Sequence, residues 1–174
     1  MKRATLKHSG FSLIELMIAI AMIGILSGIA IPSLTNLAPN YRLKAAVREL
    51  YSDMQNAKIE AIKTNTNATI LFQPGTYSPA GQVGSYQISI DSNGNGSYDV
   101  GETILAQKSM PQNVSLISAT FIGNTAGFTP RGLSLEVISR NVQLRNNQSR
   151  FYRITLSPAG ALRIHKSSDG INWN

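Results

Sequence analysis

Hydrophobic residues follow three different patterns along this chain. Residues 11–31 are almost purely apolar, residues 41–64 carry apolar side chains every three or four positions, and from residue 68 onward the apolar residues gather in short segments. A spacing of three or four is typical of one buried helix face. Short β-branched and aromatic segments, bounded by Gly, Pro, Asn or Ser, are typical of strands. The pattern therefore predicts a long N-terminal helix followed by a β-rich domain.

The apolar run has the length of a membrane-spanning helix, because 21 helical residues cover about 30 Å, the hydrocarbon thickness of a bilayer. It is preceded by the basic residues Lys2, Arg3, Lys7 and His8, which keep this end in the cytoplasm. Glu15 lies inside the run. A carboxylate in hydrocarbon is costly and is therefore a functional candidate; an acid near the membrane surface, reached by water, is the alternative.

A conventional secretory signal peptide is a competing interpretation of the run. It would place its apolar region before the cleavage site, and Gly28-Ile29-Ala30 offers small residues for that cut. This interpretation leaves Glu15 unexplained and makes no use of the junction between Gly10 and Phe11. Residues 1–10 are therefore treated as a basic leader, a processing segment that lies outside the fold.

Gly10, Phe11 and, four residues later, Glu15 open the apolar run. This arrangement resembles the precursors of type IV pilins and pseudopilins, closely so over residues 7–64. The resemblance implies that a prepilin peptidase cleaves between Gly10 and Phe11 and methylates the new amino group of Phe11. It also implies that Glu15 pairs with the ammonium group of a neighbouring subunit during assembly, which removes most of the cost of an unpaired charge in lipid.

The same resemblance implies an α+β, pilin-like fold in which a long hydrophobic N-terminal helix packs on an antiparallel β-sheet domain. We expect residues 11–32 to form the transmembrane and filament-core helix, residues 33–64 its amphipathic half, and residues 65–174 a periplasmic β-rich domain. Pro39 predicts an interruption of the helix because proline lacks a backbone donor. The apolar stripe beyond it consists of Leu43, Val47, Leu50, Met54, Ala57 and Ala61.

Asn65-Thr66-Asn67 predicts the end of the helix, and six later segments have strand character: 68–72, 86–90, 103–107, 114–117, 151–156 and 161–165. Residues 157–160 predict a turn between the last two. Residues 133–138 are a further candidate strand, and residues 141–149 predict an exposed polar loop. The strands and the helix segments 48–50 and 61–63 are similar to the minor pseudopilins of the GspH/FimT type, although this likeness is looser than that of the N-terminus.

The amino-acid composition excludes several kinds of functional site. The 174 residues hold 16 Lys and Arg against 9 Asp and Glu, a net charge of +7, with two histidines and no cysteine. A disulfide framework, a Cys-ligated zinc site and a thiol nucleophile are therefore excluded. The sequence offers no nucleophile–base pair, so we expect no enzymatic activity, no catalytic residues and no small-molecule substrate.

Residues 91–102 match the pattern of a twelve-residue calcium loop. Oxygen-bearing side chains stand at positions one, three, five, nine and twelve, with Gly96 at the sixth; they are Asp91, Asn93, Asn95, Asp99 and Glu102. A tight turn at the glycine lets alternate side chains converge on one cation. The flanks, however, are strand-like, which favours an Asn-Gly-rich hairpin turn whose side chains cap their own backbone. No other cofactor is expected, and calcium stays open.

The C-terminal half is basic: from residue 103 onward, eight Lys and Arg stand against only Glu136 and Asp169. Some FimT-type pilins bind DNA through such a region, and the nearest match here makes Arg163, His165 and Lys166 the candidate contacts. Arg163 and His165 alternate along a strand and would share a face, from which phosphates are bound in a salt-dependent way. The family's arginine pair is incomplete because Ala161 departs from it, and a solvated basic face is the alternative.

We therefore expect a minor pseudopilin, a structural subunit of the type II secretion pseudopilus that serves protein secretion across the outer membrane. The alternative is a minor type IV pilin of the FimT type that binds DNA for uptake in natural transformation or primes pilus assembly. Expected partners are other pseudopilins or pilins, the prepilin peptidase and the inner membrane, with DNA left open. The chain would cross the inner membrane once, with a cytoplasmic N-terminus and a periplasmic C-terminal domain, and enter a periplasmic pseudopilus or pilus.

Overall fold

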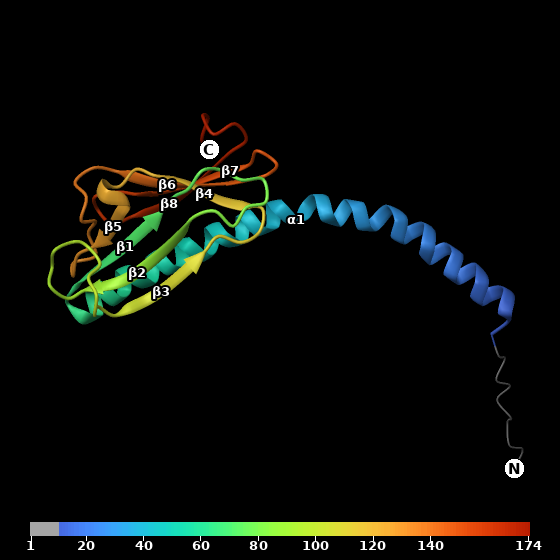
Figure 1. The fold of residues 1–174 in the computed structure, drawn as a ribbon, viewed down its shortest axis with the longest axis horizontal. Coiled ribbons are helices and arrows are strands. Elements are labelled where there is room, and N and C mark those ends of the chain that lie inside the picture. The colour runs from blue at the N-terminus through green and yellow to red at the C-terminus, as the bar shows by residue number, and fades with distance from the viewer. Residues whose placement is uncertain (1–10) are drawn as a thin grey trace, which may run out of the picture. The chain divides into compact units, whose positions relative to one another are not determined.

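The computed structural model describes the backbone of residues 11–174 and the side chains of residues 11–28 and 36–174. The predicted leader, including Gly10, lies outside the described residues. One helix, α1 (Leu13–Thr64), is followed by eight strands and a short 3-10 helix (Figure 1). Their bounds are β1 Asn67–Gln73, β2 Ser85–Asp91, β3 Ile104–Ser109, β4 Val114–Ala119, η1 Ile122–Asn124, β5 Thr125–Phe128, β6 Arg140–Asn146, β7 Phe151–Leu156 and β8 Leu162–Ser167. The chain divides into two compact units, residues 1–37 and residues 38–174.

The second unit contains two four-stranded sheets. One has the strand order β3-β2-β1-β5 and the other β4-β6-β7-β8, and every pairing between these strands is antiparallel. The strands of each sheet alternate buried and more exposed residues, as expected where one face meets a core. The predicted α+β fold, with a long helix and antiparallel sheets, is confirmed.

The apolar stripe of α1 closes this core. All six predicted stripe residues, from Leu43 to Ala61, are at most 1% exposed, and they form one cluster with the inner residues of both sheets. Polar contacts hold the helix at both sheets: Tyr86 of β2 donates to Asp53, and the ammonium of Lys58 donates to the carbonyl of Gly160 beyond β7. The buried stripe is therefore what joins the two sheets into one domain.

The helix ends where its sequence predicts. Asn65 adopts a left-handed conformation (φ 51°), and the amide of Thr66 donates to the carbonyl of Ala61 at 3.2 Å. Asparagine tolerates this conformation, which satisfies carbonyls left free at a helix end. The predicted interruption at Pro39 is wrong, because α1 continues through it and its side chain is buried. The loss of one backbone donor at Pro39 therefore does not end this helix.

All six predicted strands are present, but two other predictions are wrong. Residues 133–138 form no strand: they make one isolated bridge, between Phe128 and Ser134, and separate backbone bonds with Gly127, Thr129 and Pro158. Residues 141–146 of the predicted polar loop belong instead to β6, which lies inside the second sheet with Val142 and Leu144 buried. Two apolar residues among long polar ones suffice for a strand whose other face is solvated.

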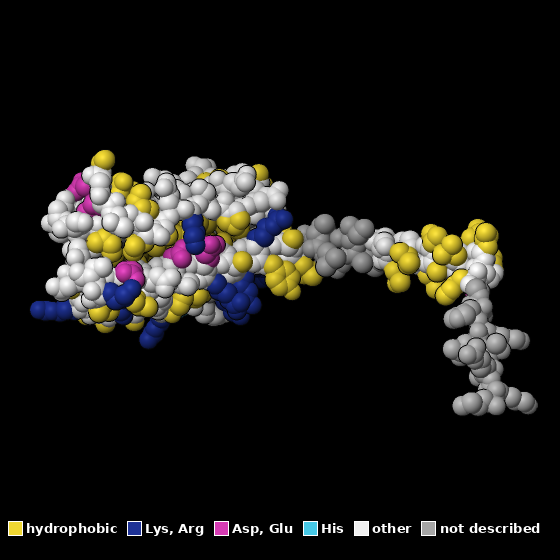
Figure 2. Space-filling view, turned by 90° about the horizontal axis from the view of Figure 1, so that it is seen from below, with side chains coloured by type: hydrophobic (Ala, Val, Ile, Leu, Met, Phe, Trp, Pro, Cys, Tyr) yellow, Lys and Arg dark blue, Asp and Glu magenta, His cyan; other side chains and the backbone are white. Residues whose placement is uncertain are grey.

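The described part of the first unit is the start of α1, with apolar side chains exposed along its length. They include Phe11, Ile14, Met17, Ile20, Ile23 and Leu26, each more than half exposed, and Figure 2 shows hydrophobic side chains along this segment. Among the residues that the structure describes, no helix has the length and apolar character needed to cross a bilayer. The predicted span of residues 11–32 includes residues 29–32, whose side chains lie outside the described part.

Replacing Leu50 with alanine tests the closing role of the stripe. Leu50 is fully buried, so we expect Leu50→Ala to lower the free energy of unfolding by about 2–5 kcal/mol, from lost burial and a residual cavity. The measurement is urea unfolding followed by circular dichroism. Ile62→Ala, on the same helix but 49% exposed, is the control and should lose much less. Equal losses would contradict a core closed by this stripe.

Candidate functional site

Glu15 has a partner within its own chain. Its carboxylate accepts a hydrogen bond from the backbone amide of Ser12 at 2.9 Å, at the first turn of α1. This is one half of a capping box, in which the acid three residues after the N-cap satisfies the N-cap amide. The carboxylate also lies at the positive end of the helix dipole. The capping box is visible in the sequence as the spacing Ser12-x-x-Glu15. The intersubunit role of Glu15 stays a prediction, as does the cleavage that would free Phe11.

The loop that joins β2 to β3 is closed by its own carboxylates. Asp91 is fully buried, and its two oxygens accept the backbone amides of Gly94, Asn95 and Gly96 at 2.8, 3.1 and 2.8 Å. Gly94 and Gly96 have φ near +75° and +79°, which their missing Cβ permits. Glu102 accepts the backbone amides of Ser92 and Asp99. The acids therefore act as internal caps of a turn.

The remaining candidate calcium ligands are engaged in the same way. Asp99 accepts the side-chain amides of Asn93 and Asn95 at 2.7 and 2.6 Å, while both asparagine carbonyls accept backbone amides of the loop. Within the described residues, no three His, Asp or Glu side chains come together in a way that could hold a metal ion. These contacts favour the hairpin turn, and calcium binding stays a prediction.

The candidate DNA-binding residues are divided between the two faces of β8. His165 lies opposite Arg153 of β7 and Arg163 opposite Thr155, so Arg163, His165 and Arg153 share one face of the sheet. Lys166 lies opposite Tyr152 and has the other orientation. The structure thus brings Arg163 and His165 together, as predicted, and separates Lys166 from them.

Aromatic rings accompany the arginines of this face. The guanidinium of Arg153 lies 4.3 Å from the ring centre of Trp173, and that of Arg145 lies 4.0 Å from Tyr77 and 5.0 Å from Phe151. These are cation–π distances. No Asp or Glu occurs in β4, β6, β7 or β8. The face is therefore cationic, with aromatic rings between the charges. The pairing of these rings with particular arginines could not be read from the sequence.

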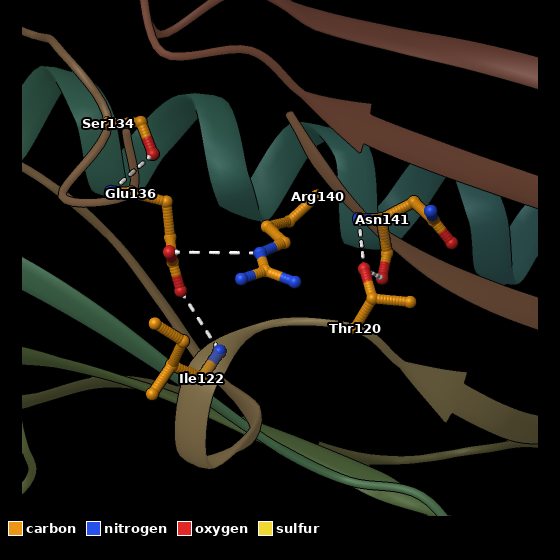
Figure 3. A network of polar contacts seen from close by, with 6 residues as sticks. All are labelled: Thr120, Ile122, Ser134, Glu136, Arg140 and Asn141. Carbon is orange, nitrogen blue, oxygen red and sulfur yellow. Dashed lines mark hydrogen bonds and ion pairs between the residues drawn. The ribbon is translucent and has the colours of Figure 1, made fainter. Parts of the chain in front are cut away.

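Glu136 is a buried acid to which the sequence assigned no role. Figure 3 shows it between η1 and the start of β6: its carboxylate accepts the amide of Ile122 at 2.9 Å and lies 3.8 Å from the Nε of Arg140. The hydroxyl of Ser134 accepts the amide of Glu136 at 3.0 Å. Glu136 thus joins the irregular segment before β6 to η1 and to the first residue of β6. In the sequence, the one sign of a special role for Glu136 was its isolation among the eight Lys and Arg of the C-terminal half.

A second ionic cluster holds α1 on the first sheet. The ammonium of Lys108, in β3, lies 2.8 Å from the carboxylates of both Glu49 and Asp53, and the Tyr86 hydroxyl donates to Asp53 at 2.6 Å. Burial and this hydrogen bond raise the pKa of Tyr86, and the bonds to Asp53 and Glu49 raise the pKa of Lys108. Both groups therefore keep their protons at neutral pH, which suits a structural contact rather than proton transfer.

Replacing Asp91 with alanine separates the cap from the cation site. Because the amides of Gly94 and Gly96 would lose their acceptor and that of Asn95 one of its two acceptors, we expect Asp91→Ala to lower the free energy of unfolding by about 2–4 kcal/mol. Asp99→Ala, which breaks only side-chain bonds, should lose less. Thermal melting is the measurement, in chelator and in millimolar calcium. If calcium raises the melting temperature of the unaltered protein and this rise is lost in both variants, the loop binds calcium and is more than a capped turn.

Comparison with known proteins agrees with this geometry. Residues 46–160 match the family described as Type II transport protein GspH, and residues 5–31 match the prokaryotic N-terminal methylation motif. The chain is 28% identical to the pilin-like protein PilA1 of Thermus thermophilus over 162 residues, 89% of this chain and 97% of that protein.

Solved structures show the same fold. The type IV minor pilin FimU of Pseudomonas aeruginosa, in one crystal form, superposes with a TM-score of 0.54 at 15% identity, over 78% of this chain and 94% of FimU. A second crystal form gives 0.51 at 16% identity, over 76% and 97%. The methylation motif implies prepilin processing, filament partners and association with a membrane or pilus. The chain belongs to the GspH family of pilin-like, non-enzymatic proteins.

Proposed function

We propose that the chain is a minor pseudopilin, a structural subunit of the type II secretion pseudopilus that serves protein secretion across the outer membrane. The observation that carries this proposal is the joining of a GspH domain to a methylation motif on one helix. From Leu43 onward that helix closes a globular core, whereas from Phe11 to Leu26 its apolar side chains are exposed. Exposed apolar surface on this scale calls for an apolar environment or partner.

In this proposal the prepilin peptidase cuts between Gly10 and Phe11 and methylates Phe11. The apolar segment first anchors the chain once in the inner membrane, with the sheets in the periplasm, and then packs among the helices of other pseudopilins. Glu15 is the only charged residue from Phe11 to Gly28. Pairing it with the ammonium of a neighbouring Phe11 would compensate both charges in an apolar core and define the axial register. The bond from Ser12 holds the carboxylate at the helix end, near such a partner.

Two substitutions of Glu15 separate its charge from its capping bond. Glu15→Gln keeps an oxygen for the Ser12 amide but removes the charge, whereas Glu15→Ala removes both. We expect both variants to be cleaved after Gly10 and both to be lost from filaments, because incorporation depends on the charge. The measurement is the amount of chain in sheared filaments relative to the membrane fraction, in cells that also make the unaltered partner subunits.

Glu15→Asp is the matched control, because it keeps the charge on a shorter side chain and should retain partial incorporation. Normal incorporation of Glu15→Gln would contradict the intersubunit pairing and leave Glu15 with the helix cap alone.

The second candidate function is DNA capture by a minor type IV pilin. The observation that favours it is the face of the second sheet that carries Arg145, Arg153 and Arg163 together with Phe151, in strands without any carboxylate. Cations bind phosphates, and aromatic rings stack with unpaired bases. The FimU likeness concerns the fold alone and does not distinguish the two functions.

Titration of DNA against the full chain in detergent, across salt concentrations, tests this candidate. If the face binds DNA, Arg163→Ala should weaken binding and reduce the salt dependence by about one released ion. Lys166→Ala, on the opposite face of β8, should change binding less. Lys63→Ala, at the end of α1, is the control for loss of any positive charge. Equal effects of all three, or no binding at low salt, would remove DNA capture and leave the face solvated.

A further inference from the structure

Positive charge gathers at the end of the unit of residues 38–174 where α1 enters it. A pocket of about 420 Å³ at this end is lined by Asn40 of α1, by Arg150 just before β7 and by Lys166 of β8. Both cations are exposed, and among the described residues neither forms an ion pair with an acid. Tyr152 and Ser168 add hydroxyl groups to the lining. Because ammonium, guanidinium and hydroxyl groups donate hydrogen bonds to anions, the polar lining of this pocket fits an anion.

The helix beside the pocket adds to this charge. Arg42 and Lys44, in the first turn after Asn40, are exposed. The sequence of α1 has no Asp or Glu between Glu15 and Glu49 that could compensate them. Beyond the pocket, Asp169 is the one acidic side chain of residues 150–174, and its carboxylate accepts four hydrogen bonds within its own turn. Cations therefore outnumber acidic side chains at this end of the unit.

Along the chain, this end of the unit is the one that follows the apolar segment of α1. In the proposed function, residues 11–31 cross the hydrocarbon of the membrane, which is about 30 Å thick. From Ile31 to Asn40 the helix rises about 14 Å at 1.5 Å per residue. The headgroup layer occupies about 5–7 Å of this distance, since a bilayer with its headgroups is about 40–45 Å thick. Long Lys and Arg side chains extend toward the interface, and a tilted helix lies closer to it. The cations around the pocket are therefore within reach of lipid headgroups.

We propose that this cationic end binds the phosphate groups of anionic phospholipids in the membrane that anchors the chain. Arg150 and Lys166 donate to a phosphate in the pocket, and Arg42 and Lys44 add attraction to the charged surface. The contact rests on the proposed function, because it needs α1 anchored in a membrane. It holds the unit against the bilayer before assembly, and it must break when the chain leaves for a filament. It differs from the candidate DNA surface, because Lys166 has the opposite orientation to Arg163 along β8.

Fluorescence quenching in vesicles tests the contact. The full chain has no cysteine, so Asn147→Cys gives a single position for a fluorophore. Asn147 is exposed and lies between Asn146 and Gln148, which are both bonded to Asn40. The vesicles are phosphatidylcholine, part of it spin-labelled on the headgroup as quencher, with or without phosphatidylglycerol. We expect phosphatidylglycerol to increase the quenching, and high salt to reverse the increase by screening the charges.

Ser97→Cys is the matched label at the other end of the unit. Ser97 is exposed and belongs to the β2–β3 loop, which Figure 1 shows at the opposite end of the sheets from the β6–β7 turn. Its quenching should not change with phosphatidylglycerol. An equal increase at both labels would overturn the proposal, because the unit would then lie on the bilayer without preference for the pocket end.

Charge variants of the Asn147-labelled chain identify the cations. Arg150→Gln and Lys166→Gln should each reduce the ratio of bound to free unit about fivefold, the contribution of one basic residue at an anionic surface. Lys166→Arg should retain the contact. Arg131→Gln is the control for loss of any charge, since Arg131 is exposed and precedes Gly132, which lies against Ile62 near the other end of α1. An equal loss in Arg131→Gln would overturn the assignment to the pocket.

Flotation of the same vesicles separates this contact from the proposed function. If the chain floats with both kinds of vesicle and phosphatidylglycerol leaves the quenching at Asn147 unchanged, the headgroup contact is wrong and the anchor stands. If the chain floats with neither kind of vesicle, the anchor is wrong, and the headgroup contact is wrong with it.

Discussion

The buried stripe of α1 is the contact on which the rest of the structure depends. Each four-stranded sheet has buried apolar residues, and Leu43, Leu50 and Met54 form one buried cluster with residues of both sheets. The ionic cluster around Lys108 and the bond from Lys58 to Gly160 reinforce a helix that apolar burial already holds. The apolar residues from Leu13 to Leu26, which are exposed, belong to the same helix. One element therefore both packs on the sheets and carries the exposed apolar segment.

The sequence predicted the elements whose apolar spacing is long or regular. The stripe from Leu43 to Ala61 was predicted from its spacing of three or four residues alone. The six strands were predicted from their β-branched residues and the turn residues that bound them. β6 was not predicted, because only two of its apolar residues, Val142 and Leu144, face the core. The long polar side chains between them belong to its solvated face. Residues 133–138 have the opposite property: their apolar pattern is typical of a strand, but their pairing with the edge strand β5 is limited to an isolated bridge between Phe128 and Ser134.

The functional residues show a similar division. Gly10, Phe11 and Glu15 are candidates because they lie in a linear motif, and residues 5–31 match the prokaryotic N-terminal methylation motif; the roles of the three residues stay predictions. The roles of Asp91 and Glu136 depend on which backbone amides the fold brings to them, Gly96 in one case and Ile122 in the other. The separation of Lys166 from Arg163 follows from alternation along β8, so the sequence already carried it. Charge counts along the chain could not resolve the contacts of Asp91 and Glu136, because loop closures are set by contacts between distant segments.

The central claim is that this chain becomes a filament subunit through α1, which begins two residues after Phe11. The most direct test is mass spectrometry of the N-terminal peptide of the chain recovered from sheared filaments. The account predicts a peptide that starts with N-methylated Phe11 and enters filaments together with the other pseudopilins. A mature chain that starts after Ala30, and is absent from filaments, would contradict it and identify the apolar run as an ordinary signal peptide.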